Sequence, residues 1–339
     1  MIDTIEQHNL LQAELAIVRN LMRDSMHSSN LIMQVCIDDM LENPGKLLRP
    51  TLVILSARMA NRTGQVLLWD PLWGGDDRVH RLAAAIEILH MATLVHDDVI
   101  DGASLRRGRP SVFARHGARI AILLGDLLFS TAFQLVADLA DTRHTSRLSR
   151  AIRAISESEI LQMKRIDPAN PGIRQYLHQI IGKTAVLFAL SSRAGAELFD
   201  SPPQELQALQ RTGYNLGMAF QITDDIMDLA ESGSQSGKTA GRDLQLGLLT
   251  LPVLLALRSM GQRNPVNSKL GQLVGKASLD LNDIVEIRNA VKLWGGIAAA
   301  QKWVQRYSDR GIRELGLFER SEAHDLFVNV TRELSQRVS

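Results

Sequence analysis

The chain has 339 residues, 45% of them hydrophobic, and its 38 basic and 37 acidic residues leave a net charge of +1. This even balance argues against nucleic-acid binding, which usually needs a basic stripe. The single cysteine, Cys36, excludes an internal disulfide, so we expect a cytoplasmic, reducing location.

The start of the chain, up to Glu14, is polar and acidic and does not resemble a signal peptide. The most apolar stretch, residues 120–140, is interrupted by Asp126 and Asp138. No run reaches the ~18 uncharged apolar residues that a membrane span needs. We therefore expect a soluble protein. A hydrophobic product could bring it into peripheral contact with membranes.

Long segments with helical periodicity predict an all-α protein. They cover residues 81–101, 174–199 and 203–230, and their common residues, Ala, Leu, Gln, Arg and Met, favour helix. Breaks are expected near residues 43–45, 71–75, 102–110, 167–172, 201–203, 232–241 and 261–268. We expect a single domain, 1–339, in which helices of about 15–25 residues form a bundle.

Two acidic clusters with the pattern Asp-Asp-x-x-Asp lie near the ends of two of these segments. The first cluster is Asp97, Asp98 and Asp101, and the second cluster is Asp224, Asp225 and Asp228. Positions i and i+4 share a helix face, about 5–6 Å apart at Cβ, so the outer carboxylates of each cluster can grip a cation together. Hard oxygen ligands favour Mg²⁺. The bland alternative is a pair of solvated acidic helix ends.

Basic residues stand close to both clusters in the sequence. They are Lys46, Arg49, Arg106 and Arg107 around the first cluster, Lys183 in an apolar segment, and Lys238 after the second cluster. One explanation of these cations is that they form surface ion pairs with the aspartates, which contribute little to stability. A diphosphate that is bridged by Mg²⁺ and clamped by Arg and Lys explains both signs of charge together.

With these motifs in this order, the sequence resembles the trans-polyprenyl diphosphate synthases, which add isopentenyl diphosphate head to tail to an allylic diphosphate. The landmarks are Gly45-Lys46-x-x-Arg49-Pro50, Glu87-x-x-His90, the first cluster, Arg106-Arg107-Gly108, Gly125-Asp126, Glu159-x-x-Gln162, Lys183-Thr184, Phe220-Gln221, the second cluster, Gly237-Lys238, Asp243 and Thr250-Leu251-Pro252. They span about residues 45–257, and residues 268–339 are expected to form packing helices.

The resemblance implies an isoprenoid-synthase bundle around a deep central cavity, acting as a homodimer or as a heteromer with a small partner. It implies that about three Mg²⁺ ions bridge the aspartates and a diphosphate. The implied metal ligands are Asp97, Asp101 and Asp224, with Asp98, Asp225 and Asp228 as further carboxylates. The implied allylic-diphosphate site is Arg106, Lys183, Gln221 and Lys238, with Thr184 orienting the reacting centre. The implied isopentenyl-diphosphate site is Lys46, Arg49, His90 and Arg107.

The resemblance assigns catalysis to a subset of these residues. They are Asp97, Asp101, Arg106, Lys183, Thr184, Asp224 and Lys238. His90, two helical turns before Asp97, would more often be structural in a helix, but the resemblance makes it a substrate contact. His96 is expected to orient an aspartate.

Product length is expected to depend on the helix that carries the first cluster. Thr93 and Ala92 precede Asp97 by four and five residues, and the resemblance places them on the upper wall of the cavity. Short-chain members tend to carry aromatics there or a longer acidic motif, and this sequence does neither. We therefore expect a long product of about C30 to C50, suited to quinone side chains. The alternative is ordinary helix packing at both positions and a short C15 or C20 product.

Other functions stay open. A class I terpene cyclase usually replaces the second aspartate cluster with an Asn/Ser/Glu triad and needs an aromatic pocket, whereas this chain is 4% aromatic. A non-catalytic subunit should have lost an acidic cluster, but the catalytic half of a heteromer would keep both. Residues 69–77 match no motif and suggest a surface loop or a partner contact.

Overall fold

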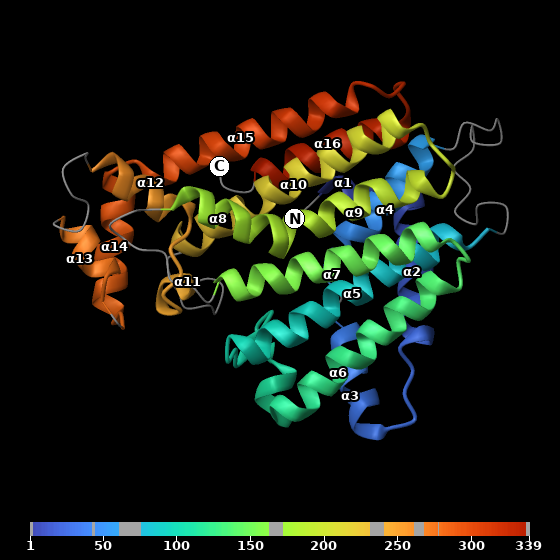
Figure 1. The fold of residues 1–339 in the computed structure, drawn as a ribbon, viewed down its shortest axis with the longest axis horizontal. Helices are drawn as coiled ribbons and strands as arrows, with labels where there is room; N and C mark the ends of the chain where they lie inside the picture. The colour runs from blue at the N-terminus through green and yellow to red at the C-terminus, as the bar shows by residue number, and fades with distance from the viewer. Residues whose placement is uncertain are drawn as a thin grey trace. The chain divides into compact units, whose positions relative to one another are not determined.

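Helices form almost all of the described structure (Figure 1). The computed structural model describes residues 3–42, 45–60, 76–162, 172–230, 241–260, 268–276 and 278–336. In this part of the chain the only strands are β1 (Leu105–Arg106) and β2 (Arg109–Pro110), which pair antiparallel. The prediction of an all-α protein is confirmed.

Contacts divide the chain into two compact units. Unit 1 consists of Met1–Ala151, Leu187–Gly213 and Arg313–Glu333, and unit 2 consists of Ile152–Val186, Tyr214–Ile312 and Leu334–Ser339. Each unit is assembled from separated segments of the chain. The expectation of a single domain stays a prediction, as does the deep central cavity.

Unit 1 contains the N-terminal helices. They are α1 (Asp3–Gln7), α2 (Asn9–Ser25), α3 (Leu31–Leu41), α4 (Leu48–Ala60), α5 (Arg78–Ile100) and α6 (Val112–Ala137). Side chains cap several of them: the Asn30 carboxamide accepts from two amides of α3, and the Ser111 hydroxyl accepts from Ala114 N. Helices α5 and α6 lie side by side in Figure 1 and make the most extensive helix pair.

A glycine explains the close approach of α5 and α6. A Cβ atom on Gly125 of α6 would lie 2.0 Å from the His96 ring of α5, so only glycine fits there. The ring Nε2 of His96 lies 3.0 Å from Ile122 O and 3.7 Å from Asp126 Oδ1. His96 therefore attaches the helix of the first cluster to α6.

Four long helices have residues in both units. They are α7 (Thr142–Gln162), α10 (Pro203–Ala230), α15 (Gly296–Leu315) and α16 (Glu322–Gln336), and α9 (Val186–Glu197) begins one residue before the boundary. Helix α10 has the bounds that the sequence predicted. The segment predicted to be helical at residues 174–199 is continuous but includes a π-helical turn at Ile181–Ala185 between α8 (Ile173–Ile180) and α9.

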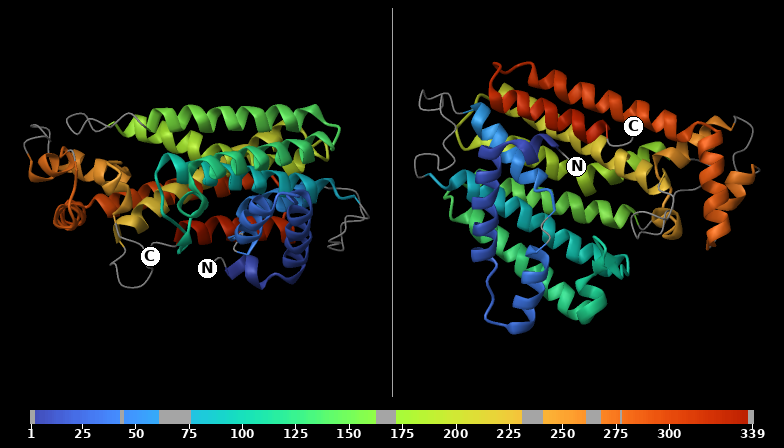
Figure 2. Two further views of the ribbon diagram at one scale, coloured as in Figure 1. Left: turned by 90° about the horizontal axis from the view of Figure 1, so that it is seen from below. Right: turned by 180° about the vertical axis from the view of Figure 1, so that it is seen from behind.

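The remaining helices belong to unit 2. They are α11 (Arg242–Gln245), α12 (Leu251–Ser259), α13 (Lys269–Val274) and α14 (Leu281–Leu293). Helices α12, α13 and α14 group together in both views of Figure 2, in agreement with their contacts. The predicted C-terminal packing helices are thus present, and Pro252 of the Thr250-Leu251-Pro252 landmark lies in the first turn of α12.

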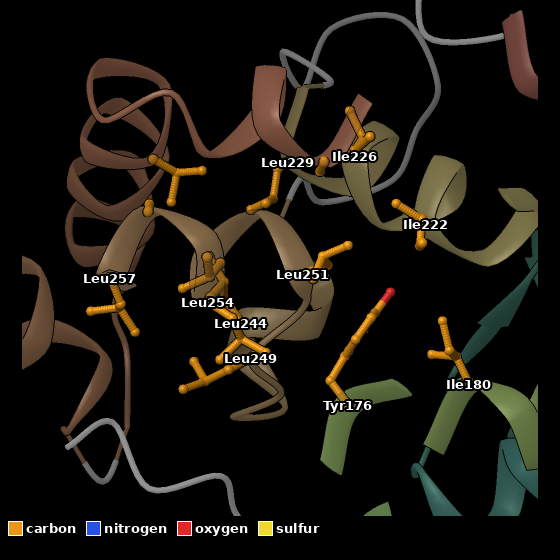
Figure 3. Close-up of a cluster of buried hydrophobic side chains, with 14 of the residues drawn as sticks. Tyr176, Ile180, Ile222, Ile226, Leu229, Leu244, Leu249, Leu251, Leu254 and Leu257 are labelled. Atoms are coloured by element: carbon orange, nitrogen blue, oxygen red, sulfur yellow. The ribbon is translucent and has the colours of Figure 1, made fainter. Parts of the chain in front are cut away.

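The core of unit 2 includes leucine and isoleucine residues of α10, α11, α12 and α14, together with Tyr176 of α8 (Figure 3). Among the described residues one helix, α6, is long and apolar enough to cross a membrane by length and composition alone. The expected breaks at 102–110 and 201–203 are confirmed. Those near 71–75 and 232–241 lie wholly or almost wholly outside the described residues.

Candidate active site

The first cluster lies at the C-terminal end of α5 in unit 1, and its three aspartates have different surroundings. Asp97 and Asp101 are half-buried, and Asp101 is the C-cap of the helix. Asp98 is buried, and its Oδ1 accepts hydrogen bonds from Arg106 Nε at 3.0 Å and from Arg106 Nη2 at 2.6 Å. Successive helix residues point about 100° apart, so the middle aspartate turns inward while Asp97 and Asp101 share a face.

The two arginines after the first cluster occupy a tight hairpin. Leu105 pairs with Pro110 and Arg106 with Arg109, so Arg107 and Gly108 form the two-residue loop. Both loop residues have positive φ, 52° and 78°, as a type I′ turn requires. The turn separates the two side chains. Arg106 binds Asp98, while the guanidinium of Arg107 lies against Gly45, where an added Cβ would be 2.5 Å from Nη2.

A second group of unit 1 gathers around α5 one to three turns before the cluster. The guanidinium of Arg49, at the start of α4, lies over the Phe188 ring at 4.9 Å. Burial, followed by the charges of Arg49, Arg107 and Arg106, holds the pKa of His90 well below its usual value. Burial also raises the pKa of Glu87, and Arg49 and Arg107 oppose that rise.

These electrostatic couplings show that Arg49, Arg107 and His90, three of the four residues expected to bind isopentenyl diphosphate, are neighbours. The fourth, Lys46, is exposed in the short segment before α4. Because His90 is uncharged near neutral pH, it can act there only through hydrogen bonds. Buried Glu87 places a carboxyl group close to Arg49 and Arg107.

The two residues expected to control product length lie on the same helix. Ala92 has no exposed surface, and Thr93 is half-buried with its hydroxyl donating to His90 O at 2.8 Å. A pocket of unit 1 next to α5 is lined by Met40, Met91 and other residues, but by neither Ala92 nor Thr93. The role of both residues in product length stays a prediction.

The second cluster lies near the C-terminal end of α10 in unit 2, and its aspartates also differ. Asp224 is exposed, while Asp225 is buried. The two oxygens of Asp228 accept hydrogen bonds from the backbone N–H groups of Arg242 and Asp243, at 3.2 and 3.3 Å. Asp228 thereby fixes the first turn of α11, and its share in metal binding stays a prediction.

Asp225 is the most perturbed carboxyl group of this cluster. Burial, together with the charges of Asp243 and Asp224, raises the pKa of Asp225 to about 8, although hydrogen bonds from Tyr176 and Gln221 oppose this. Such crowding of carboxyl groups would be relieved by a divalent cation held at the cluster. In this respect the residues present fit a Mg²⁺ ion.

No group of three or more His, Cys, Asp or Glu side chains within the described ranges is arranged to hold a metal ion without other ligands. A Mg²⁺ ion usually binds one or two carboxylates together with waters and substrate phosphates, so it does not need such a group.

The π-helical turn carries Lys183 and Thr184 in unit 2. Lys183 Nζ lies 2.9 Å from Glu159 Oε1 and 3.3 Å from Gln162 Oε1, so the Glu159-x-x-Gln162 landmark of α7 holds this cation. Helix α7 can approach because a Cβ at Gly182 would lie 2.4 Å from the Ser158 Cβ. A π turn inside an α-helix often marks a functional site.

Thr184 is buried and donates a hydrogen bond to Gln221 Oε1 at 2.6 Å, so the structure joins two residues that the sequence assigned to one diphosphate site. Lys238 lies outside the described residues, as do residues 69–75 of the segment 69–77. Sequence reasoning missed Tyr176, whose hydroxyl binds Asp225 at 2.6 Å. Its only sequence signal is a lone tyrosine two helical turns before Lys183.

Comparison with known proteins decides the family. A model of the polyprenyl synthetase family matches residues 30–291, which is most of the chain. The chain belongs to the polyprenyl synthetase family. It is therefore a prenyltransferase, and the resemblance inferred from the motifs is confirmed.

Two curated relatives of this polyprenyl synthetase match along most of their length. Heptaprenyl diphosphate synthase component 2 of Geobacillus stearothermophilus is 35% identical over 88% of this chain and 88% of its own. Octaprenyl diphosphate synthase of Escherichia coli is 31% identical over 80% of this chain and 79% of its own.

Solved structures confirm the isoprenoid-synthase fold of this polyprenyl synthetase. A polyprenyl synthase of Caulobacter crescentus, complexed with calcium and isoprenyl diphosphate, has a TM-score of 0.88 and 31% identity, covering 100% of this chain and 98% of its own. A geranylgeranyl pyrophosphate synthase of Lactobacillus brevis has a TM-score of 0.87 and 30% identity, covering 99% and 100%. Fold similarity therefore does not separate long-chain from short-chain members.

Proposed function

We propose that this prenyltransferase condenses isopentenyl diphosphate with an allylic diphosphate, such as farnesyl diphosphate, to a long-chain all-trans polyprenyl diphosphate of about C30 to C50. The names of the heptaprenyl and octaprenyl relatives support a long product. The alternative is a C15 or C20 product, and the similarity to a geranylgeranyl pyrophosphate synthase structure keeps it open. The presence of both acidic clusters speaks against a terpene cyclase.

The observation that carries the proposal is the division of basic groups within unit 1. Arg106 lies at the first cluster, whereas Arg107 is turned toward Gly45 and couples to His90. The two neighbouring arginines can thus each bind a different diphosphate, as a reaction with two diphosphate substrates requires. We assign the allylic diphosphate to Arg106, Lys183, Gln221 and Lys238, and isopentenyl diphosphate to Lys46, Arg49, His90 and Arg107.

In this reaction the allylic C–O bond breaks, and the pair of electrons leaves with pyrophosphate. Arg106 and Lys183 offset the charge that grows on the leaving group. The double bond of isopentenyl diphosphate then forms the new C–C bond, and a proton is lost to the released pyrophosphate. The residues around His90 hold isopentenyl diphosphate in position for this step.

We further propose that Asp97, Asp101 and Asp224 hold Mg²⁺. The raised pKa of the neighbouring Asp225 supports a cation at the second cluster. The calcium in the Caulobacter crescentus complex supports a divalent ion in the family. When bound, about three such ions would supply positive charge to the departing pyrophosphate.

We also propose a cytoplasmic protein that associates with membranes peripherally and acts as a homodimer. The alternative to a homodimer is a heteromer with a small subunit, which the words "component 2" in the name of the Geobacillus relative suggest. The low cysteine content supports the cytoplasm.

The central experiment is incubation of the purified chain with Mg²⁺, isopentenyl diphosphate and a series of allylic diphosphates, followed by product chromatography. We expect a product of about C30 to C50, loss of turnover with a chelator, and recovery with Mg²⁺. A C15 or C20 end point would exclude the long-chain proposal. Consumption of allylic diphosphate without isopentenyl diphosphate would point to a cyclase.

Product length has its own test at the first-cluster helix. We expect Ala92→Phe to shorten the product while turnover continues, because a ring five residues before Asp97 would block the chain's path. Thr93→Phe tests the half-buried neighbour, and Ala137→Phe, at the exposed end of α6, is the control. Unchanged product length in both helix-α5 variants would remove this wall as the determinant.

A further inference from the structure

A chain of three hydrogen bonds runs through unit 2 from a buried tyrosine to Thr184. The Tyr176 hydroxyl donates to Asp225 Oδ2 at 2.6 Å. Gln221 Nε2 donates to the other carboxyl oxygen, Oδ1, at 2.9 Å. Thr184 Oγ1 donates to Gln221 Oε1 at 2.6 Å. The chain thus links α8, α10 and the π-helical turn.

Tyr176 has no role in the proposed substrate sites, yet its hydroxyl makes a specific hydrogen bond within an apolar core. The residue is 3% exposed and lies in the apolar core of unit 2. In Figure 3 the hydroxyl end of Tyr176 points toward the helix that carries Ile222 and Ile226, which is α10. The Tyr176 hydroxyl carries one proton and lies 2.6 Å from Asp225 Oδ2, so it is the donor of this hydrogen bond.

The consequence for Asp225 is a fixed carboxyl group, because each of its oxygens accepts from a different donor. The fixed Oδ1 in turn sets the orientation of the Gln221 amide, since its Nε2 must face Asp225. Its Oε1 then faces Thr184 and takes the only hydroxyl proton of that residue. Thr184 is left with oxygen lone pairs, which interact favourably with positive charge and not with phosphate oxygens.

We propose that Tyr176 is a positioning residue for prenyl transfer: acting through Asp225 and Gln221, it holds Thr184 with its lone pairs available to the positive charge that develops on the allylic carbon. This inference rests on the proposed function. It makes Tyr176 important for the rate of the chemical step and not for the binding of either diphosphate.

The first test is Tyr176→Phe, which removes the hydroxyl and keeps the ring. We expect kcat to fall about tenfold while both KM values stay within about twofold. The affinity for the allylic diphosphate without isopentenyl diphosphate, measured by calorimetry, should not change. The control is Tyr307→Phe, which removes a hydroxyl from the same core cluster and should leave kcat unchanged. A kcat within about twofold of the wild type, or a KM that rises with the loss of rate, would overturn the inference.

The second test asks whether the hydroxyl acts through Thr184. In a Thr184→Val background the effect of Tyr176→Phe on kcat should largely disappear. If the two residues acted independently, the fold-decreases in kcat of the two single variants would multiply in the double variant. Radiolabelled isopentenyl diphosphate extends the measurement to slow variants. If Tyr176→Phe does not fold, as judged by its thermal unfolding, a double-mutant cycle of Asp225→Asn and Thr184→Val replaces it. This cycle tests the same coupling, because Asp225 links Tyr176 to Gln221 and Thr184. The wild-type assay tests the proposed function separately, because every comparison is made relative to wild-type turnover.

Discussion

At the scale of single residues, the middle aspartate of each acidic cluster differs from its neighbours. Asp98 is buried and bound by Arg106, and Asp225 is buried and bound by Tyr176 and Gln221. In each cluster the first aspartate is more exposed. In each cluster the middle aspartate therefore fixes the surrounding side chains, and we expect the first aspartate to be the one that binds a cation.

Gly45 offers a sharp prediction at this scale. Its φ of +80° disfavours a side chain, and a Cβ there would displace the Arg107 guanidinium. We expect Gly45→Ala to raise the KM for isopentenyl diphosphate about tenfold and to change the KM for the allylic diphosphate by less than about threefold. Steady-state kinetics with each substrate varied in turn measures this.

The matched control is Gly117→Ala in α6. Gly117 has the same φ of +80°, but nothing lies within 4 Å of its added Cβ. It therefore introduces similar backbone strain without touching Arg107. Equal kinetic effects of both substitutions would attribute the loss to strain and contradict the role of Arg107.

His90 gives a prediction about pH. Because its pKa is held well below the usual value, the folded enzyme keeps a neutral His90 where the unfolded chain takes up a proton. His90 therefore lowers the free energy of unfolding as pH falls below about 6.5, and it has no such effect above that pH. We expect His90→Gln to unfold less steeply with falling pH than the wild type, as thermal melts from pH 5 to 8 would show.

If His90 acts as a neutral hydrogen-bond donor, substitutions at this position should differ in their effect on the KM for isopentenyl diphosphate. We expect His90→Gln to raise the KM for isopentenyl diphosphate less than His90→Ala, since glutamine retains an N–H donor. A similar loss in both variants at pH 7.5 would indicate that a charged imidazolium binds the diphosphate.

At the scale of elements, buried charges join the helices that support the first cluster. Glu14 of α2 is fully buried and accepts from Arg58 of α4 at 2.8 and 3.1 Å, and His80 of α5 lies 3.3 Å from its other oxygen. These contacts connect α2, α4 and α5. Removing one partner leaves an uncompensated buried charge.

We expect Glu14→Gln to lower the free energy of unfolding by about 3 kcal/mol, because it removes the buried carboxylate that accepts two hydrogen bonds from Arg58. Urea denaturation measures this change. The control Glu157→Gln breaks a surface pair with Arg153 of α7, in which the side chains are 80% and 62% exposed, and should change stability by less than about 0.5 kcal/mol. Similar values for the two would show that the buried pair contributes no more than an exposed one.

The C-terminal helices also act on the catalytic segments, although they carry no recognised motif. Arg288 of α14 donates to Leu229 O at 2.7 Å and to Ala230 O at 3.3 Å. These are carbonyls at the C-terminal end of α10, directly after the second cluster. Helix α14 therefore caps the helix of the second cluster and does more than pack.

At the scale of the whole molecule, both acidic clusters belong to one chain, the first in unit 1 and the second in unit 2. We therefore expect the purified chain to elongate an allylic diphosphate without another subunit. Its oligomeric state, measured by light scattering under assay conditions, should be a homodimer. Turnover that appears only after addition of a second, smaller protein would instead favour a heteromeric synthase.

The family, the all-α class and the helices of residues 203–230 and 81–101 are predictable from the amino-acid sequence alone. Helical periodicity and Asp-Asp-x-x-Asp spacing are local properties, so one sequence suffices to find them. Lys183, Thr184 and Gln221 are predicted as site residues in a similar way, because they belong to motifs in a fixed order, and that role stays a prediction. The sequence could not give their contacts, which join positions far apart in the chain.

How the charged groups pair with one another is known from the tertiary structure and not from the sequence. The structure showed that Arg106 and Arg107 turn apart, because a two-residue hairpin with positive φ at Arg107 and Gly108 separates their side chains. It showed that Glu159 and Gln162 hold Lys183, and that Tyr176 reaches Asp225. Hydrogen bonds and burial depend on which segments meet in space, and no local pattern in the sequence encodes that meeting.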